Sequence, residues 1–266
     1  MLKTRVITAL LLAAGFFLGL FFLPEPAWAV LVAAVVWLAA WEWCALVKAV
    51  PWGRYVFASA VAVPVALAGF MPRDVVLMAF AFVSAMALWI FTAPTLLRFQ
   101  PRLDGFYPRF VLGAFAIMPA GLAMIELRSG SPLLLLMALL PVSIADIAAY
   151  FVGRKWGRNK LAPTISPGKS REGAAGGIAA VVVYAIALGL LFPAVSAKIP
   201  LGWLVPLAVL YALLSIEGDL FESMLKRQAQ VKDSGTLLPG HGGVLDRIDS
   251  LLSTLPLAAL LWMIFR

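Results

Sequence analysis

The chain has 266 residues, of which 63% are hydrophobic and only 13% are charged, and its formal net charge is +8. Soluble domains contain about 45–50% apolar and about 25% charged residues, so this composition excludes an ordinary soluble domain. The mean hydropathy of +0.99 agrees, and we expect lipid to cover most of the surface. The basic charge would suit a nucleic-acid partner in a soluble protein, but no separate basic domain carries it, so we expect no nucleic acid.

Nine apolar stretches are long enough to be membrane-spanning helices, which need about 20 mostly apolar residues each. They cover residues 6–23, 27–47, 55–71, 75–97, 110–126, 132–152, 173–194, 201–222 and 250–265. The sequence therefore predicts an all-α, polytopic membrane protein that forms one integral membrane domain over residues 1–266. The first stretch resembles a signal peptide, but a second span follows it at once, so we expect a retained helix.

The Lys and Arg residues lie almost entirely on one side of these spans. If the N-terminus is cytoplasmic, all but four of the 21 basic residues fall on the cytoplasmic side, the four being Arg73, Arg128, Lys198 and Arg266. Cytoplasmic loops carry the excess of Lys and Arg in membrane proteins, so the bias predicts this orientation and an odd number of spans. Two long polar loops, 153–172 and 223–249, would then be cytoplasmic.

Several carboxylates lie inside or beside apolar stretches. A charged side chain inside a bilayer costs on the order of 2.5–3.5 kcal/mol on insertion scales, so such residues usually face a polar cavity and have a function. Asp146 lies within one predicted span, and Asp219 lies near the end of another. Glu42, between Trp41 and Trp43, also lies in an apolar stretch, but a structural or interfacial role is as reasonable for it as a functional one.

One face of a continuous helix would carry Asp219, Ser223 and Lys226, which are spaced i, i+4 and i+7. The Ser223 hydroxyl would bind a phosphate or bond to its own helix backbone. Asp246 and Asp249 likewise share a face at the mouth of the last span. Hard cations such as Mg²⁺ prefer carboxylate oxygens, whereas one histidine and one cysteine nearly exclude a zinc site.

Glycines and basic residues fill the stretch between these acids, from Lys232 to Gly243. Glycines let backbone amides approach a phosphate closely, and four basic residues between 226 and 247 add positive charge. A second polar segment, residues 166–173, also combines basic residues with a carboxylate just before a span. Neither has the P-loop spacing. Nonspecific binding of lipid headgroups by basic residues is the alternative, but it does not explain the nearby acids.

These residues together resemble the signature of the phosphatidate cytidylyltransferases, also called CDP-diacylglycerol synthases. The matching residues are Ser223, Lys226-Arg227, Lys232-Asp233, Pro239, His241-Gly242-Gly243, Asp246-Arg247 and Asp249. A second stretch is similar to the family's other polar segment and contains Asp146, Tyr150, Gly153, Gly157, Ser166-Pro167, Lys169 and Glu172-Gly173. We therefore expect residues 131–266 to be the catalytic C-terminal half and residues 1–130 to be N-terminal spans.

The resemblance implies transfer of CMP from CTP to phosphatidic acid, which gives CDP-diacylglycerol and pyrophosphate, in the cytoplasmic (inner) membrane. It also implies Mg²⁺ as a cofactor, K⁺ as a candidate second cation, and a homodimer. For this reaction we assign catalytic roles to Asp219, Asp246, Lys226 and Arg227, and metal binding to Asp219, Asp246, Asp249, Asp146 and Glu172. The residues assigned to substrate binding are Lys169, Ser223, Lys232, His241, Gly242, Gly243 and Arg247. His241 would bind the cytosine or ribose, or would shape the turn between its glycines, and Arg247 would orient neighbouring carboxylates.

Two other functions are compatible with parts of the pattern. A CTP-dependent lipid-alcohol kinase looks similar around the nucleotide loop, but its alcohol acceptor would need a general base. A lipid or ion transporter is the second alternative, because buried acids also line transport paths. The products separate the three: CDP-lipid with pyrophosphate, phospholipid with CDP, or no turnover.

Overall fold

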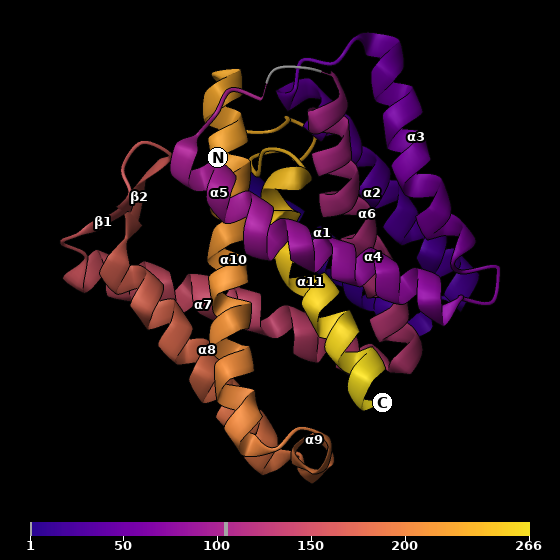
Figure 1. Cartoon of the computed structure of the whole chain (residues 1–266), viewed down its shortest axis with the longest axis vertical. Helices are drawn as coiled ribbons and strands as arrows, with labels where there is room; N and C mark the ends of the chain where they lie inside the picture. The colour runs from indigo at the N-terminus through magenta and orange to yellow at the C-terminus, as the bar shows by residue number, and fades with distance from the viewer. Residues whose placement is uncertain (1, 104–105) are drawn as a thin grey trace.

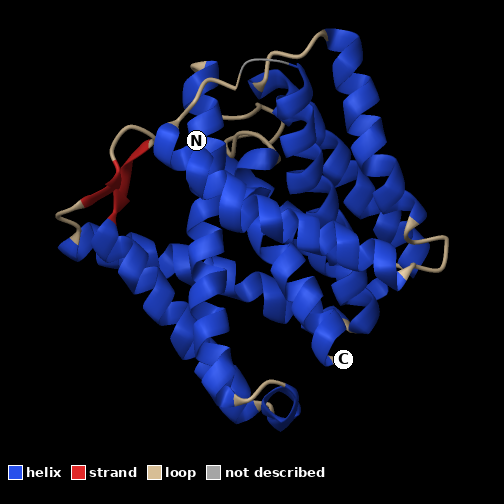
Figure 2. Cartoon of the chain, in the orientation of Figure 1, coloured by secondary structure: helices blue, strands red, loops and turns tan. Residues whose placement is uncertain are grey.

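Helices make up nearly all of the secondary structure of the protein in a computed structural model (Figures 1 and 2), which describes residues 2–103 and 106–266. The described side chains exclude residues 2–5, 106–108 and 194, so Lys3 and Arg5 of the predicted charge bias lie outside them. The helices are α1 (Leu2–Phe22), α2 (Glu25–Leu46), α3 (Pro51–Leu67), α4 (Val75–Ala87), α5 (Ala93–Phe99), α6 (Phe106–Gly130), α7 (Pro132–Trp156), α8 (Arg171–Leu191), α9 (Pro193–Lys198), α10 (Leu201–Ala229) and α11 (Leu245–Phe265). A π-helical segment, η1 (Leu88–Thr92), joins α4 to α5.

Seven helices within the described residues are long and apolar enough to cross a membrane. They are α2, the continuous α4–η1–α5 segment, α6, α7, α8, α10 and α11. The apolar part of α1, Val6–Phe22, is shorter, and so is α3 with 17 residues. The prediction of an all-α polytopic membrane protein is confirmed, and α1 and α3 account for the difference between these seven helices and the nine predicted spans.

Capping residues and prolines set where several helices begin. Pro51 and Pro132 start α3 and α7, because proline has a helical φ and lacks the N–H that a first turn leaves unpaired. Ser131 caps α7 with its hydroxyl, and Asp74 caps α4 with its carboxylate. These local signals divide the apolar sequence into separate helices.

Three of the segments predicted to be cytoplasmic lie toward one end of the molecule. In Figure 1 the N-terminus, the start of α3 and the end of α10 lie toward the top, whereas α9 and the C-terminus lie toward the bottom. Helix α10 packs against both α8 and α11. Helices α7 and α8 pack closely at Gly173 and Gly177, where an added Cβ would lie 2.8 Å from the Ala149 oxygen and 3.0 Å from the Ala145 oxygen.

Aromatic packing joins the two halves of the chain close to the C-terminal acids. Phe221 of α10 stacks on Trp43 of α2 with ring centroids 6.2 Å apart, and meets Trp89 of η1 edge-on at 5.4 Å. All three side chains are buried. Such pairs contribute roughly 0.5–1.5 kcal/mol each beyond the burial of their area. The part of α10 that carries Asp219 is therefore fixed against the N-terminal helices.

Both polar segments differ from their predicted form. Helix α10 continues to Ala229, so the segment between α10 and α11 is shorter than the predicted loop 223–249 and comprises residues 230–244, here called the glycine-rich loop. The predicted loop 153–172 begins with the last turn of α7 and contains an antiparallel hairpin of β1 (Lys160–Ala162) and β2 (Ser166–Ser170). Apolarity marks where a helix leaves lipid, not where its backbone hydrogen bonds end.

Candidate active site

The middle of α10 meets the β-hairpin through Asp219. The Lys169 ammonium on β2 contacts Asp219 Oδ2. The Ser223 hydroxyl donates a hydrogen bond to Asp219 Oδ1 at 3.3 Å, so this hydroxyl bonds to a side chain one turn away. Each of these side chains is part-buried. The structure thus brings together three of the predicted site residues from two separate polar segments.

Lys226 joins α10 to α11 through two carboxylates. Its ammonium contacts Glu222 Oε2 and lies 2.7 Å from Asp246 Oδ1. Asp246 Oδ2 accepts hydrogen bonds from the amides of Ser234 at 2.9 Å and Gly243 at 2.8 Å. Both Asp246 oxygens are therefore engaged by the protein, and Lys226 and Asp246 hold the glycine-rich loop against α10. Glu222 was not among the predicted site residues, although its i, i+4 spacing to Lys226 was a usable signal.

Glu42 of α2 is a second anchor of the glycine-rich loop. Its carboxylate, on a residue that is 6% exposed, accepts hydrogen bonds from the Val244 amide at 3.0 Å, the Leu245 amide at 2.8 Å and the Ser234 hydroxyl at 3.0 Å. A Cβ on Gly243 would lie 2.5 Å from Glu42 Oε2, so only glycine permits this approach. The negative charge also lies at the N-terminus of α11, where it is favourable. Glu42, whose role the sequence left open, thus holds the segment that carries the family signature.

A tight turn at residues 238–242 completes the glycine-rich loop. Leu238 and Gly242 form an antiparallel bridge, and the His241 amide donates to the Leu238 oxygen at 2.8 Å. Gly242 has φ +82°, and a Cβ there would lie 2.8 Å from Asp246 Oδ2. His241 Nδ1 is buried and has no hydrogen-bond partner among the described residues. The backbone contacts support the turn-shaping role of His241, and its ligand-binding role stays a prediction.

Three carboxylates, Asp146, Asp219 and Asp249, form what we call the acidic group. Asp146 of α7 and Asp249 of α11 both lie within electrostatic range of Asp219 and Lys169. Asp249 Oδ1 accepts a hydrogen bond from the Ser250 amide at 2.8 Å, and Oδ2 accepts none from any described residue. Asp146 and Lys169 line a cavity of about 340 Å³ between α7, α8, α10 and β2. The cavity is therefore bordered by one carboxylate of the acidic group, Asp146, and by two basic side chains, Lys169 and Arg154.

The acidic group has the donor atoms that suit Mg²⁺, since hard cations bind carboxylate oxygens. Across residues 2–103 and 106–266, no three acidic, His or Cys side chains converge tightly enough to be a preformed metal site. Glu172 is engaged elsewhere, because its oxygens accept from the amides of Arg158 and Asn159 at 3.2 Å and from Asn159 Nδ2 at 2.7 Å. Metal binding by Glu172 or Asp246 stays a prediction. It would require Glu172 to release these hydrogen bonds, or Asp246 to release its contacts with Lys226 and the loop amides.

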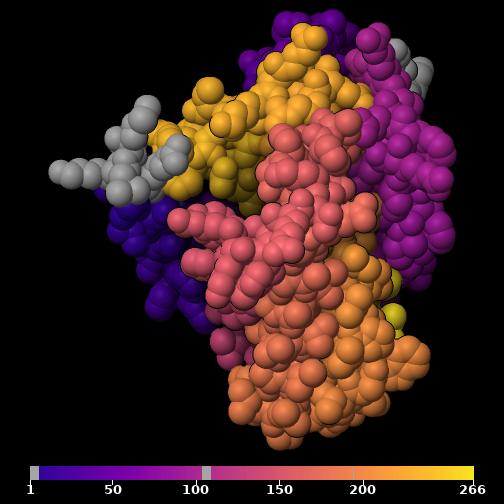
Figure 3. All heavy atoms as spheres, turned by 90° about the vertical axis from the view of Figure 1, so that its left-hand side faces the viewer, coloured from indigo at the N-terminus to yellow at the C-terminus, as the bar shows by residue number. Residues whose placement is uncertain are grey.

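Three basic residues of the predicted site, Arg227, Lys232 and Arg247, have exposed side chains. Arg227 Nε donates to the Ile165 oxygen at 3.2 Å and ties α10 to the β-hairpin. Lys232 and Arg247 form no ion pair with any described residue, and the side chain that contacts Asp246 is Lys226. Figure 3 shows gold atoms of the C-terminal half and the pink segment that leads from α7 into the hairpin on the same face of the molecule. Exposed cations thus lie in the glycine-rich loop and on the helices on either side of it.

The fold and this site define the class of the protein: it is a polytopic membrane protein in which carboxylates, lysines and a glycine-rich loop lie close together in a helix bundle. The model of the cytidylyltransferase family matches residues 3–265, and the chain belongs to this family. A phosphatidate cytidylyltransferase from Pseudomonas aeruginosa is 42% identical over 271 residues, which cover 98% of this chain and 97% of the relative. One from Haemophilus influenzae is 32% identical over 96% of both chains, and one from Brucella suis is 54% identical over 121 residues, 45% of this chain and 43% of the relative. The predicted family is confirmed.

Proposed function

We infer that the protein is a phosphatidate cytidylyltransferase, which transfers CMP from CTP to phosphatidic acid and forms CDP-diacylglycerol and pyrophosphate. Membership of the cytidylyltransferase family and the names of its full-length relatives support this reaction. The structural observation that best supports this reaction is the contact of Lys169 with Asp219, because this contact brings the two polar segments into one site. The nearby cavity opens this site toward a substrate.

The reaction requires two highly anionic substrates to meet. A phosphate oxygen of the lipid forms a bond to the α-phosphorus of CTP, and the bond from that phosphorus to the bridging oxygen breaks, so that pyrophosphate leaves with the electron pair. The second pKa of a phosphate ester is about 6, so the attacking oxygen is already ionised at neutral pH and needs no general base. Catalysis of such a transfer is mostly positioning and charge neutralisation.

The basic residues of the site supply much of that neutralisation in our proposal. Lys169 borders the cavity and contacts a single carboxylate, so its ammonium can also contact a phosphate placed there. Lys232 is exposed within the glycine-rich loop and Arg247 is exposed in the first turn of α11, and both can bind the phosphates of CTP. The contacts of Lys226 with two buried carboxylates support a positioning role for it, through the placement of Asp246 and the loop.

We also propose that the acidic group binds Mg²⁺. Asp219 and Asp249 would hold the ion, with Asp146 beside them, because Asp249 Oδ2 accepts no hydrogen bond from any described residue and the group carries excess negative charge. When bound, the ion supplies positive charge against the phosphates of both substrates. K⁺ is the candidate second cation.

We further propose that the protein lies in the cytoplasmic (inner) membrane with its N-terminus and both polar segments in the cytoplasm, as a homodimer. The orientation is supported by the basic residues, all but four of which would be cytoplasmic.

Two differently labelled forms of CTP test the reaction directly. The purified full-length protein is incubated in lipid vesicles with phosphatidic acid, Mg²⁺ and CTP labelled at either the α- or the γ-phosphate. We expect the α-label in the lipid and the γ-label in pyrophosphate, and no labelled lipid when diacylglycerol replaces phosphatidic acid. Transfer of the γ-label to lipid would instead identify a lipid kinase, and the absence of any labelled product would refute enzymatic turnover.

A further inference from the structure

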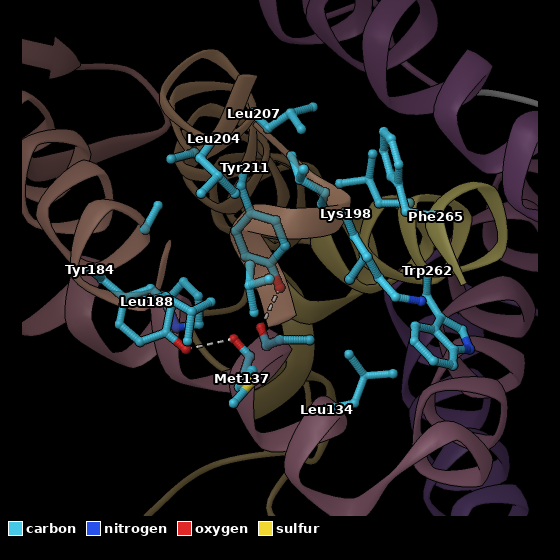
Figure 4. Close-up of a pocket in the computed structure, with 18 of the residues that line it drawn as sticks. Leu134, Met137, Tyr184, Leu188, Lys198, Leu204, Leu207, Tyr211, Trp262 and Phe265 are labelled. Carbon is cyan, nitrogen blue, oxygen red and sulfur yellow. Dashed lines mark hydrogen bonds between the residues drawn. The ribbon is translucent and has the colours of Figure 1, made fainter. Parts of the chain in front are cut away.

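A second cavity lies at the end of the molecule opposite to the candidate active site (Figure 4). Its volume is about 360 Å³, and it lies between the first halves of α7 and α10, the second halves of α8 and α11, and α9. Its walls are almost entirely apolar and include Leu134, Leu188, Leu204, Leu207 and Phe265. Cavities that bind small ligands have volumes of about 300–1,000 Å³, so this one is large enough to hold part of a lipid.

The tyrosines in this cavity offer no free hydrogen-bond donor to a ligand. The Tyr184 hydroxyl donates to the Met137 oxygen at 3.0 Å, and the Tyr211 hydroxyl donates to the Ala138 oxygen. Figure 4 shows both hydroxyls turned toward these α7 carbonyls. A polar ligand placed among such walls would lose its hydrogen bonds to water without replacement. The interior of the cavity therefore suits a hydrocarbon chain.

Among the described residues that line the cavity, Lys198 of α9 is the single charged one. Its ammonium lies 5.6 Å from the centre of the Trp262 ring, and Figure 4 shows its side chain extended toward this ring. The side chain is exposed, and no described carboxylate lies within ion-pair distance of it. Tryptophan and lysine at the end of a span are typical of the headgroup level of a membrane. An apolar cavity thus opens beside an unpaired cation at that level.

We propose that this cavity holds an acyl chain of a phospholipid with an anionic headgroup, whose phosphate lies against Lys198. The lipid belongs to the leaflet at the α9 end of the molecule, and so differs from the substrate bound at the other end. The apolar walls select the chain, and the charge of Lys198 selects the headgroup. A lysine–tryptophan pair that is only a membrane anchor needs no cavity, and Lys155 with Trp156 is such an exposed pair at 4.6 Å near the end of α7.

Lipid retention by the purified full-length protein tests this proposal. The protein in detergent is titrated with phosphatidylglycerol or phosphatidylcholine of identical acyl chains, and bound lipid is counted by native mass spectrometry. We expect one retained phosphatidylglycerol and a preference of about 5-fold over phosphatidylcholine, as one lysine near a membrane surface provides. Lys198→Gln should remove the preference, whereas Lys155→Gln should keep it.

Cavity-filling variants test the acyl-chain part. Ala258 and Leu207 line the cavity, so Ala258→Phe or Leu207→Trp should abolish retention of both lipids while the thermal midpoint stays near that of the unmodified protein. If one variant does not fold, the other decides. Equal binding of the two lipids, an unchanged preference in Lys198→Gln, or full retention in a folded cavity-filling variant would overturn the proposal. The proposal would also be overturned if a cavity-filling variant changed from dimer to monomer and still retained lipid, because a second copy of the chain would then be the occupant of the cavity.

Discussion

Substitution of Glu42 should inactivate the enzyme although this residue lies outside the signature segment. Its carboxylate holds the start of α11 and Ser234 through three hydrogen bonds, and α11 carries Asp246 and Asp249. Glu42→Gln preserves shape, but it replaces one acceptor oxygen with an NH₂ group that faces N–H or O–H donors. The loop should therefore become less ordered while the helix bundle persists.

The size of the effect follows from the hydrogen bond and the negative charge that the substitution removes. A hydrogen bond to a charged group contributes about 1.5–3 kcal/mol. The favourable interaction of the carboxylate with the N-terminus of α11 adds about 0.3–1 kcal/mol. Loss of one bond and of the charge thus raises the free energy of the ordered loop by about 2–4 kcal/mol. If the loop must be ordered in the transition state, kcat/KM falls by about 30- to 1,000-fold.

A second buried glutamate provides the control. Glu126 is 5% exposed and pairs with Arg73 and Arg266 at the opposite end, so Glu126→Gln reports a general loss of stability. The assays are CDP-lipid formation in vesicles and hydrogen exchange of the amides of residues 234–249. Faster exchange and low activity should appear in Glu42→Gln alone, with a smaller loss in Glu42→Asp. Near-normal activity of Glu42→Gln, or equal losses in both Gln variants at equal thermal midpoints, would refute the anchoring role.

Three further outcomes are expected. Lys226→Met should lower the thermal midpoint and abolish turnover, because removing one partner of a buried ion pair costs about 3–5 kcal/mol; a stable, active variant would contradict its contacts with Glu222 and Asp246. Gly242→Ala should reduce turnover, since its φ is +82° and strained backbone costs of order 1–3 kcal/mol, whereas Gly202→Ala, with no atom within 4 Å of the added Cβ, should stay active. Chelation of divalent cations should stop CDP-lipid formation and added Mg²⁺ should restore it, while activity unaffected by the chelator would exclude the proposed metal.

The helical architecture was predictable because lipid allows few alternatives to a helix for a long apolar stretch. Apolarity was less informative about the ends. Helix α3 was predicted at 55–71 and lies at Pro51–Leu67, because Pro51 starts the helix before the most apolar residues begin. Helical spacing carried α10 only as far as Lys226 although the helix continues to Ala229, and the β-hairpin was missed because it occurs in a polar segment without a clear period.

The site was predictable only as a set of residues. Helical spacing correctly placed Asp219 and Ser223 one turn apart, and the motifs brought Lys169 into the same site. The partners of Glu42 lie about 200 residues away in the chain, at Val244 and Leu245, and no local pattern reports such a contact. Likewise, nothing in the sequence indicated that Glu172 accepts hydrogen bonds from the Arg158 and Asn159 amides, or that Asp246 accepts one from the Gly243 amide and contacts Lys226.

Rates of CDP-lipid formation by the Asp219→Asn and Asp249→Asn enzymes test the proposed role of the acidic group most directly. Each substitution keeps the volume of the side chain and removes one negative charge. Both variants should fold normally and lose activity by about 100-fold or more. Asp74→Asn is the matched control and should stay fully active, because asparagine caps a helix as well as aspartate does and Asp74 only caps α4. Near-normal rates in both acidic-group variants would contradict its role in catalysis.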